Sequence, residues 1–202
     1  KTILLTATLT SDSYRTIRSL FSSEHFRVVS ELALRPEPGF VIKGAKDDFE
    51  RSSMVEDALR LFPRPVILYT SLREDADRWF ERARSLGFRR IRLVKGGDLA
   101  SGPGDKILGE WRDGDIDVIV ATSAFGLGVD QNNVRSVVHA CLPESIDRFY
   151  QEVGRSGRDG RASVSLLVTS PDDEGTAKNL SGKTRISIDR GFERWMEMWT
   201  RK

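Results

Sequence analysis

The segment VIVATSAFGLGVD, residues 118–130, decides the fold of this 202-residue chain. It opens with a β-branched run, which is typical of a buried strand in a parallel sheet. The run ends in the hydroxyl pair Thr122 and Ser123, and a glycine-punctuated loop leads on to the carboxylate Asp130. Hydroxyls and backbone N–H groups at a strand end suit nucleic-acid phosphates, and a carboxylate there can accept from a ribose hydroxyl.

Strand-like runs alternate with helical periods along most of the chain. We expect strands at 40–42, 66–70, 91–94, 116–122, 134–140 and 164–169, and helices at 54–61, 72–86, 104–112 and 144–151. This alternation predicts an α/β fold with a parallel sheet covered by helices on both faces. Ligands of such sheets bind outside the carboxyl ends of the strands, so Thr70 and Ser71 should lie near Thr122 and Ser123. Trp79 and Phe80 share the apolar face of their helix, and we expect both in the core.

A second informative segment is QEVGRSGRDG, residues 151–160, which sets two arginines three apart between small residues. Each guanidinium of Arg155 and Arg158 offers a planar fork of donors that matches phosphate oxygens. Gly154 and Gly157 remove side chains that would block a ligand from approaching the backbone. The pattern predicts a phosphate-binding turn that can stabilise charge during phosphoryl transfer.

These segments give the chain a family resemblance. It resembles the second RecA-like domain of superfamily 2 helicases, and RecQ-type DNA helicases in particular. ATSAFGLGVD (121–130) is similar to the family's motif V, and YQEVGRSGRDG (150–160) to its motif VI. VILYTS (66–71) is similar to motif IV, and LTAT (5–8) to motif III. The implied fold is a RecA-like parallel sheet of the P-loop NTPase type that lacks its own Walker A loop.

The resemblance also implies roles for individual residues. ATP binds between two RecA-like domains, and the first domain, outside this chain, holds the Mg²⁺. Arg155 and Arg158 then act as catalytic arginine fingers on the β- and γ-phosphates. The nucleotide-binding set is completed by Gly128, Asp130 and Gln151. The contacts to the nucleic-acid backbone come from Thr70, Ser71, Lys95, Thr122 and Ser123.

The expected function is therefore the motor half of an ATP-dependent DNA helicase or translocase that moves 3′ to 5′ on single-stranded or partly duplex DNA. Motif VI carries Gln151 and Glu152, as in RecQ-type enzymes, where DEAD-box RNA helicases have His-Arg. This chain alone should be inactive, because the resemblance puts the phosphate loop in the first domain. The alternative is a non-catalytic nucleic-acid-binding or assembly module with a helicase-like fold.

The chain divides into three expected parts. Residues 1–33 are expected to be a remnant of the first RecA-like domain, with strands at 2–5 and 26–29 and a helix at 11–21 capped by Ser11 or Asp12. A segment at 34–39 links it to the second domain, which spans residues 34–175. Residues 176–202 form an extension with an amphipathic helix at 191–199. Its aromatic stripe is a candidate docking face for another domain or protein, made by Phe192, Trp195 and Trp199.

The extension and the composition argue against a kinase, a metal site and a membrane protein. Residues 177–184 fit a loose Walker A pattern, which would make a small kinase using Lys183. They follow no buried strand directly, so we expect a loop there and no phosphate site. Cys141 is the single cysteine, and no apolar run approaches the length of a membrane span. We expect no metal site, no membrane partner and a cytoplasmic or nuclear location. The net charge of +2 places no overall basic field on the protein.

Overall fold

The computed structural model describes residues 3–6, 9–21, 26–30, 33–96, 98, 102–123, 125, 131–184 and 188–200. Its centre is a six-stranded sheet in the order β1-β6-β5-β2-β4-β3, and every strand pair is parallel. The strands are β1 (Pro38–Gly44), β2 (Val66–Thr70), β3 (Ile91–Val94), β4 (Val118–Thr122), β5 (Ser136–His139) and β6 (Ser163–Thr169). The predicted parallel α/β sheet is confirmed.

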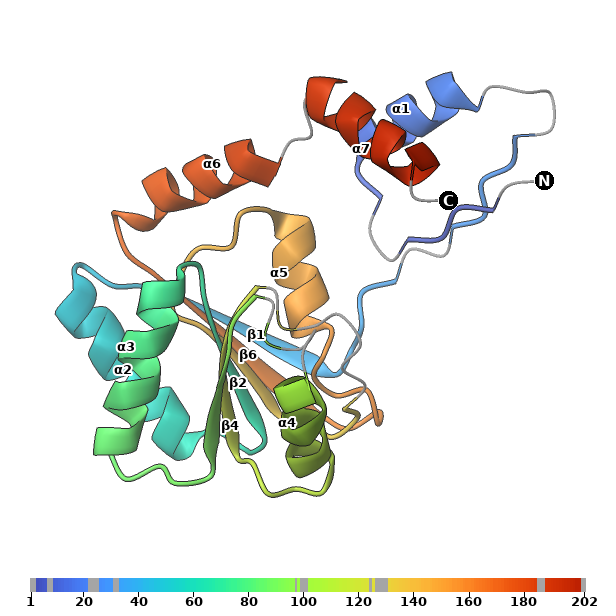
Figure 1. Ribbon diagram of the computed structural model, residues 1–202. Coiled ribbons are helices and arrows are strands. Elements are labelled where there is room, and N and C mark those ends of the chain that lie inside the picture. The colour runs from blue at the N-terminus through green and yellow to red at the C-terminus, as the bar shows by residue number, and fades with distance from the viewer. Residues whose placement is uncertain are drawn as a thin grey trace.

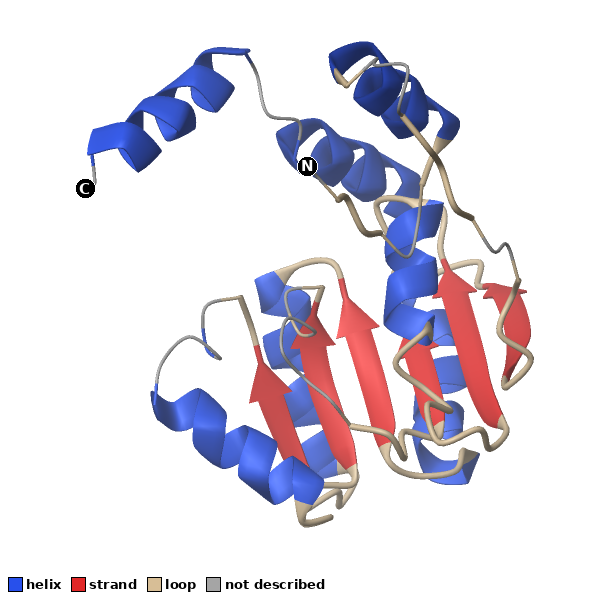
Figure 2. Ribbon diagram, turned by 90° about the vertical axis from the view of Figure 1, so that its right-hand side faces the viewer, coloured by secondary structure: helices blue, strands red, loops and turns tan. Residues whose placement is uncertain are grey.

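Helices cover both faces of the sheet, as Figure 2 shows. One face packs against α2 (Asp48–Leu61) and α3 (Arg73–Ser85), in a core that includes Trp79 with Phe80 at its margin. The other face packs against α4 (Gly102–Arg112) and α5 (Ile146–Val153). Every residue of β2 and β4 is buried, because alternate side chains enter the two cores. The continuous apolar runs in the sequence therefore mark two interior strands of the sheet.

Local sequence explains where the covering helices begin. The side chain of Asp47 accepts a hydrogen bond of 2.8 Å from the Glu50 N–H and caps α2. Ser145 accepts one of 3.1 Å from the Arg148 N–H and caps α5 in the same way. Such caps satisfy N–H groups that have no partner within the helix. The cap at Ser145 fixes where the helix leading into residues 151–160 starts.

Strand β2 lies between β4 and β5, so the carboxyl ends of these three strands are neighbours at one edge of the sheet. Thr70 is level with Thr122, and Tyr69 is level with both Ala121 and His139. We call this side of the sheet the carboxyl edge. The loops after β2, β3 and β4, which carry the predicted nucleic-acid contacts, leave the sheet here.

The N-terminal prediction was wrong in part. Residues 3–6 and 26–29 form no strand, because they have no neighbouring strand to pair with, and Leu5 is 92% exposed. The predicted helix is confirmed as α1 (Ser11–Leu20). Its cap is Thr10 rather than Ser11 or Asp12, since the Thr10 hydroxyl accepts from the Ser13 N–H at 3.1 Å.

The loop predicted at 177–184 was also wrong, because these residues belong to α6 (Asp173–Thr184). Asp173 and Glu174 lie in the first turn, where carboxylates stabilise the helix dipole. Lys178 Nζ lies 2.7 Å from Glu174 Oε1, one turn along the helix. The Walker-like residues are thus the end of a helix, and the kinase alternative has no phosphate loop.

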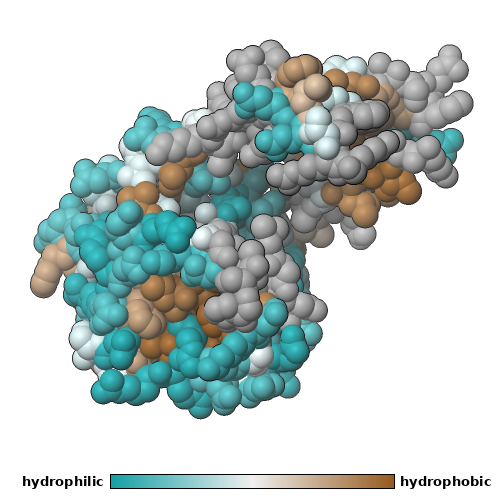
Figure 3. Space-filling view, in the orientation of Figure 1, coloured by the Kyte–Doolittle hydropathy of each residue, from teal (hydrophilic) through white to brown (hydrophobic). Residues whose placement is uncertain are grey.

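The predicted amphipathic helix is confirmed as α7 (Ile188–Thr200). Figure 1 shows α1, α6 and α7 beyond the carboxyl edge, and Figure 2 shows that α1 and α7, which overlap in the first view, lie apart. Phe192 and Trp195 are 64% and 54% exposed, whereas the side chain of Trp199 lies outside the described residues. Figure 3 shows a hydrophobic area on the otherwise hydrophilic front of the sheet body. Within the described part of the chain, no helix is long and apolar enough to cross a membrane.

Candidate nucleotide and nucleic-acid site

The turn that follows α5 holds the two predicted arginines in a shape that requires glycine. Gly157 has φ +63°, and a Cβ there would lie 2.8 Å from both the Arg161 carbonyl oxygen and the Glu37 Cβ. Its N–H donates to the Val134 carbonyl at 3.0 Å. The buried Ser156 hydroxyl donates to the Val153 carbonyl at 2.9 Å. Residues 154–160, which we call the arginine turn, are therefore fixed to the body of the domain.

An arginine from outside the motif also holds this turn. Arg35 Nη1 donates to the Gly154 carbonyl and Nη2 to the Gly157 carbonyl, each at 2.8 Å. Its Nε lies 3.2 Å from Glu37 Oε2. Sequence reasoning missed this residue, because an arginine in a linker carries no local signal of what it contacts.

The two predicted catalytic arginines point to different places. Arg158 is exposed, and its Nε donates to the Gly154 carbonyl at 3.3 Å. Arg155 is half-buried and interacts with the phenol of Tyr69. Burial raises the pKa of this phenol, and the positive charge of Arg155 opposes part of that rise. One guanidinium thus faces solvent, while the other lies against the end of β2. The arrangement leaves Arg158 accessible to a phosphate brought up from outside this domain.

A buried polar network behind the turn was not predicted. His139 Nε2 lies 3.0 Å from Glu152 Oε2, and Glu152 Oε1 accepts from Arg148 Nε at 3.1 Å. The His139 and Glu152 side chains are 0% and 4% exposed. The imidazole also stacks against Tyr69, with ring centroids 5.3 Å apart. This network anchors α5 to the end of β5.

The network continues into the loop after β4. Arg148 Nη2 donates to the Ser123 carbonyl, and the Tyr69 hydroxyl donates to the Phe125 carbonyl at 3.1 Å. The helix that leads into motif VI and the end of motif IV are therefore both hydrogen-bonded to motif V. Thr122 is buried and Ser123 is half-buried. Gly128 and Asp130 lie outside the described residues.

At the end of β2, the structure separates the two predicted hydroxyls. Thr70 is 2% exposed, and its hydroxyl donates to the Leu72 carbonyl at 3.1 Å. Ser71 is half-buried, and its hydroxyl donates to the Leu142 carbonyl at 3.5 Å. Ser71 is thus the hydroxyl of this pair that a ligand at the edge can reach. Burial raises the pKa of the neighbouring Cys141 thiol to about 12.

Lys95 and Gln151 complete the predicted set. The Lys95 ammonium lies 2.8 Å from Asp77 Oδ1. The backbone N–H of Lys95 donates to Asp98 Oδ2 at 2.7 Å. A phosphate at Lys95 therefore competes with the Asp77 carboxylate, a pairing that the sequence did not reveal. Gln151 is exposed on α5, one residue before the buried Glu152.

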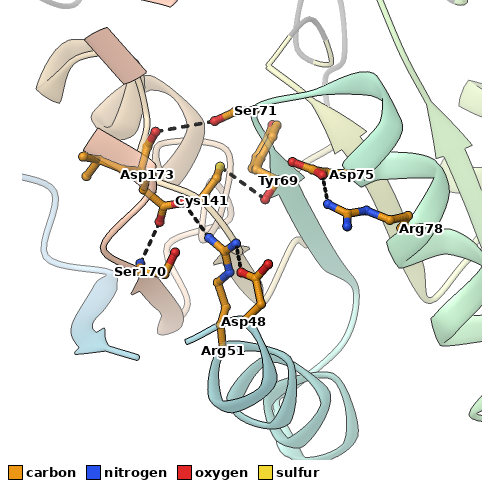
Figure 4. Close-up of polar contacts among 10 residues, drawn as sticks. Asp48, Arg51, Tyr69, Ser71, Asp75, Arg78, Cys141, Ser170 and Asp173 are labelled. Carbon is orange, nitrogen blue, oxygen red and sulfur yellow. Dashed lines mark hydrogen bonds and ion pairs between the residues drawn. The ribbon is translucent and has the colours of Figure 1, made fainter. Parts of the chain in front are cut away.

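A charged cluster fastens α6 beside this edge (Figure 4). Arg51 of α2 contacts the Asp173 carboxylate at 2.5 Å, and Asp48 also binds its guanidinium. Asp173 Oδ2 accepts from the Ser170 N–H at 2.8 Å. The first turn of α6 is thereby tied to both α2 and the end of β6.

A six-stranded parallel sheet covered by helices, with hydroxyl-bearing loops at its carboxyl edge and an arginine turn between α5 and β6, is a RecA-like fold. The chain belongs to the family described as the helicase conserved C-terminal domain, whose model matches residues 50–160. The resemblance to RecQ-type DNA helicases is confirmed by the relatives described next.

The chain is 33% identical over 171 residues to the probable ATP-dependent DNA helicase RecS of Bacillus subtilis, covering 85% of this chain and 34% of the relative. It is 40% identical over 111 residues to the ATP-dependent DNA helicase RecQ of the same organism, covering 53% of this chain and 18% of the relative. The chain thus spans a minor part of either protein. The yeast DEAD-box splicing factor Prp28 shares the fold, with a TM-score of 0.65 at 20% identity over 89% of this chain and 40% of that one.

Proposed function

We propose that this chain is the motor half of an ATP-dependent DNA helicase or translocase, working with a first RecA-like domain elsewhere in the full-length protein. The observation that carries the proposal is the arginine turn. Its backbone is fixed by Gly157 and Arg35, yet it leaves Arg158 exposed on the connection between α5 and β6. A rigid turn that presents a guanidinium outward is suited to a phosphate held by another domain.

The two arginines divide the work in this proposal. Arg158 acts as the arginine finger on the ATP phosphates. Arg155 interacts with Tyr69 and so links the arginine turn to β2. Gly128, Asp130 and Gln151 contribute to nucleotide binding, as the resemblance implies. Mg²⁺ is held by the first domain. Closure of the two domains on ATP assembles the site, and opening after hydrolysis moves the grip on DNA.

The DNA contacts come from the loops after β2 and β4. Ser71 and Ser123 are accessible there, while the buried Thr70 and Thr122 hold the strand ends in place. Lys95 adds a charge if a phosphate displaces Asp77. Contacts of this kind are made to the backbone, so they carry little sequence preference. The hydrogen bonds from Arg148 and Tyr69 to the motif V loop connect the proposed DNA contacts to the helix that leads into the arginine turn.

The test uses the full-length protein. We expect ATP hydrolysis that single-stranded DNA stimulates more than RNA of the same sequence does. We also expect displacement of a strand from a duplex with a 3′ tail, and no displacement from one with a 5′ tail. DNA binding without ATP turnover would instead establish the non-catalytic binding module. Hydrolysis without strand displacement would restrict the activity to translocation.

A further inference from the structure

The segment that precedes β1 is bonded directly to the arginine turn. We infer that Arg35 is a positioning residue for Arg158, through which the interdomain segment sets the placement of the arginine finger. The inference rests on the proposed function, in which Arg158 acts on ATP. Arg35 lies outside the motifs that carry the family resemblance, and the inference assigns it a role in turnover.

The contacts of Arg35 span the whole base of the turn. Its two terminal nitrogens bind the carbonyls of Gly154 and Gly157, which lie on either side of Arg155. The Gly154 carbonyl also accepts from Arg158 Nε at 3.3 Å. One carbonyl oxygen therefore fixes both the linker arginine and the finger. A shift of the Arg35 guanidinium moves the group against which Arg158 rests.

The backbone around Arg35 is itself fixed at several points. The Arg35 N–H donates to the Tyr150 hydroxyl of α5 at 3.1 Å. Two residues later, the Glu37 carbonyl accepts from the Ser163 N–H of β6 at 2.9 Å. Glu37 Cβ occupies the space that a side chain at Gly157 would need. Residues 35–37 are thus packed against the turn without a gap, and a displacement of this segment is transmitted to it.

Only arginine can make this arrangement. Its planar fork binds two carbonyls and one carboxylate at once, whereas a lysine offers a single ammonium centre. The competing explanation is that Arg35 merely caps the C-terminal end of α5, since Gly154 is the C-cap residue. A cap alone predicts a loss of stability, with turnover per folded molecule unchanged. The two explanations therefore differ in kcat.

The experiment compares Arg35→Lys with wild type in the full-length protein. Arg89→Lys is the matched control, because Arg89 is exposed before β3, the edge strand on the opposite side of the sheet from β1. We expect Arg35→Lys to lower the DNA-stimulated kcat by roughly 10- to 100-fold, the order that a small misplacement of a catalytic group produces. The Kd for a non-hydrolysable ATP analogue and the Kd for a single-stranded oligonucleotide should stay at their wild-type values. The control should leave all three unchanged.

A double variant separates positioning from a general structural effect. If Arg35 acts through Arg158, then Arg35→Lys combined with Arg158→Ala is no slower than Arg158→Ala alone. Multiplying losses, or a normal kcat for Arg35→Lys, would overturn the inference. If Arg35→Lys does not fold, Glu37→Gln loosens the same guanidinium and should show a smaller fall with the same non-additivity. A wild-type protein without turnover would overturn the proposed function as well, whereas an active wild type with an unaffected Arg35→Lys would overturn this inference alone.

Discussion

Removing the charge of Glu152 should destabilise the domain through the buried network. The carboxylate is 4% exposed and binds both the Arg148 guanidinium and the His139 imidazole, which is itself 0% exposed. Glu152→Gln keeps the shape but weakens two contacts to an ionised group, which costs about 1.5–3 kcal/mol. Glu152→Ala removes one partner of a buried ion pair and should cost about 3–5 kcal/mol.

Urea denaturation followed by circular dichroism measures the difference in unfolding free energy between each variant and wild type. The m-value must stay unchanged for the shift in midpoint to report stability. In a domain of this size, each kcal/mol shifts the Tm by about 2–4 °C, so Glu152→Gln should melt roughly 3–12 °C lower. Glu174→Gln is the control, because its pair with Lys178 is exposed and should add little. The reasoning is refuted if Glu152→Gln unfolds at the same urea concentration as wild type.

Three further predictions concern single groups. Gly157→Ala should destabilise the domain by about 1–3 kcal/mol, because it combines positive φ with a steric clash; Gly160→Ala, which has φ +77° and open space, should cost less in the same urea titration. Cys141 should resist a thiol reagent at pH 8 until the protein unfolds. A pKa of about 12 leaves roughly one cysteine in 10⁴ as thiolate at that pH, whereas an ordinary pKa near 8.5 leaves about a quarter as thiolate. Fast labelling of the native protein would contradict this prediction. A hydrogen bond from Arg135 lowers the pKa of Asp159, so the ionised carboxylate stabilises the folded protein at neutral pH. This stabilisation is lost as the pH falls below about 4 and the carboxylate is protonated. The Tm difference between wild type and Asp159→Asn should therefore close over that range.

The sheet was predictable because its interior strands carry their own signal. Residues 66–70 and 118–122 are rich in apolar β-branched residues up to a final threonine, and a strand buried on both faces needs such a run. The arginine turn was also visible, since Gly157 is required by the local backbone and lies between the two arginines. These features depend on residues close together in the chain.

The parts that escaped prediction depend on distant residues or on competing local signals. Arg35 binds carbonyls 119 and 122 residues away, and nothing near it in the sequence indicates those partners. Glu152 and His139 were separated by a loop and assigned to different elements. Thr70 was predicted to contact the nucleic-acid backbone; its side chain is buried, and its hydroxyl donates to the Leu72 carbonyl. Residues 177–184 were expected to form a loop because no buried strand leads directly into them, whereas the acidic first turn of α6 was the sign of a helix.

The central claim is that this domain contributes an arginine to ATP cleavage in trans. The most direct measurement is the DNA-stimulated kcat of full-length wild type and Arg158→Ala, together with the Kd of each for a non-hydrolysable ATP analogue. Arginine fingers are worth about 10³–10⁵ in turnover, so we expect kcat to fall by several hundred-fold or more while the Kd is largely retained. An unchanged kcat would remove the arginine turn from the chemistry and contradict the account.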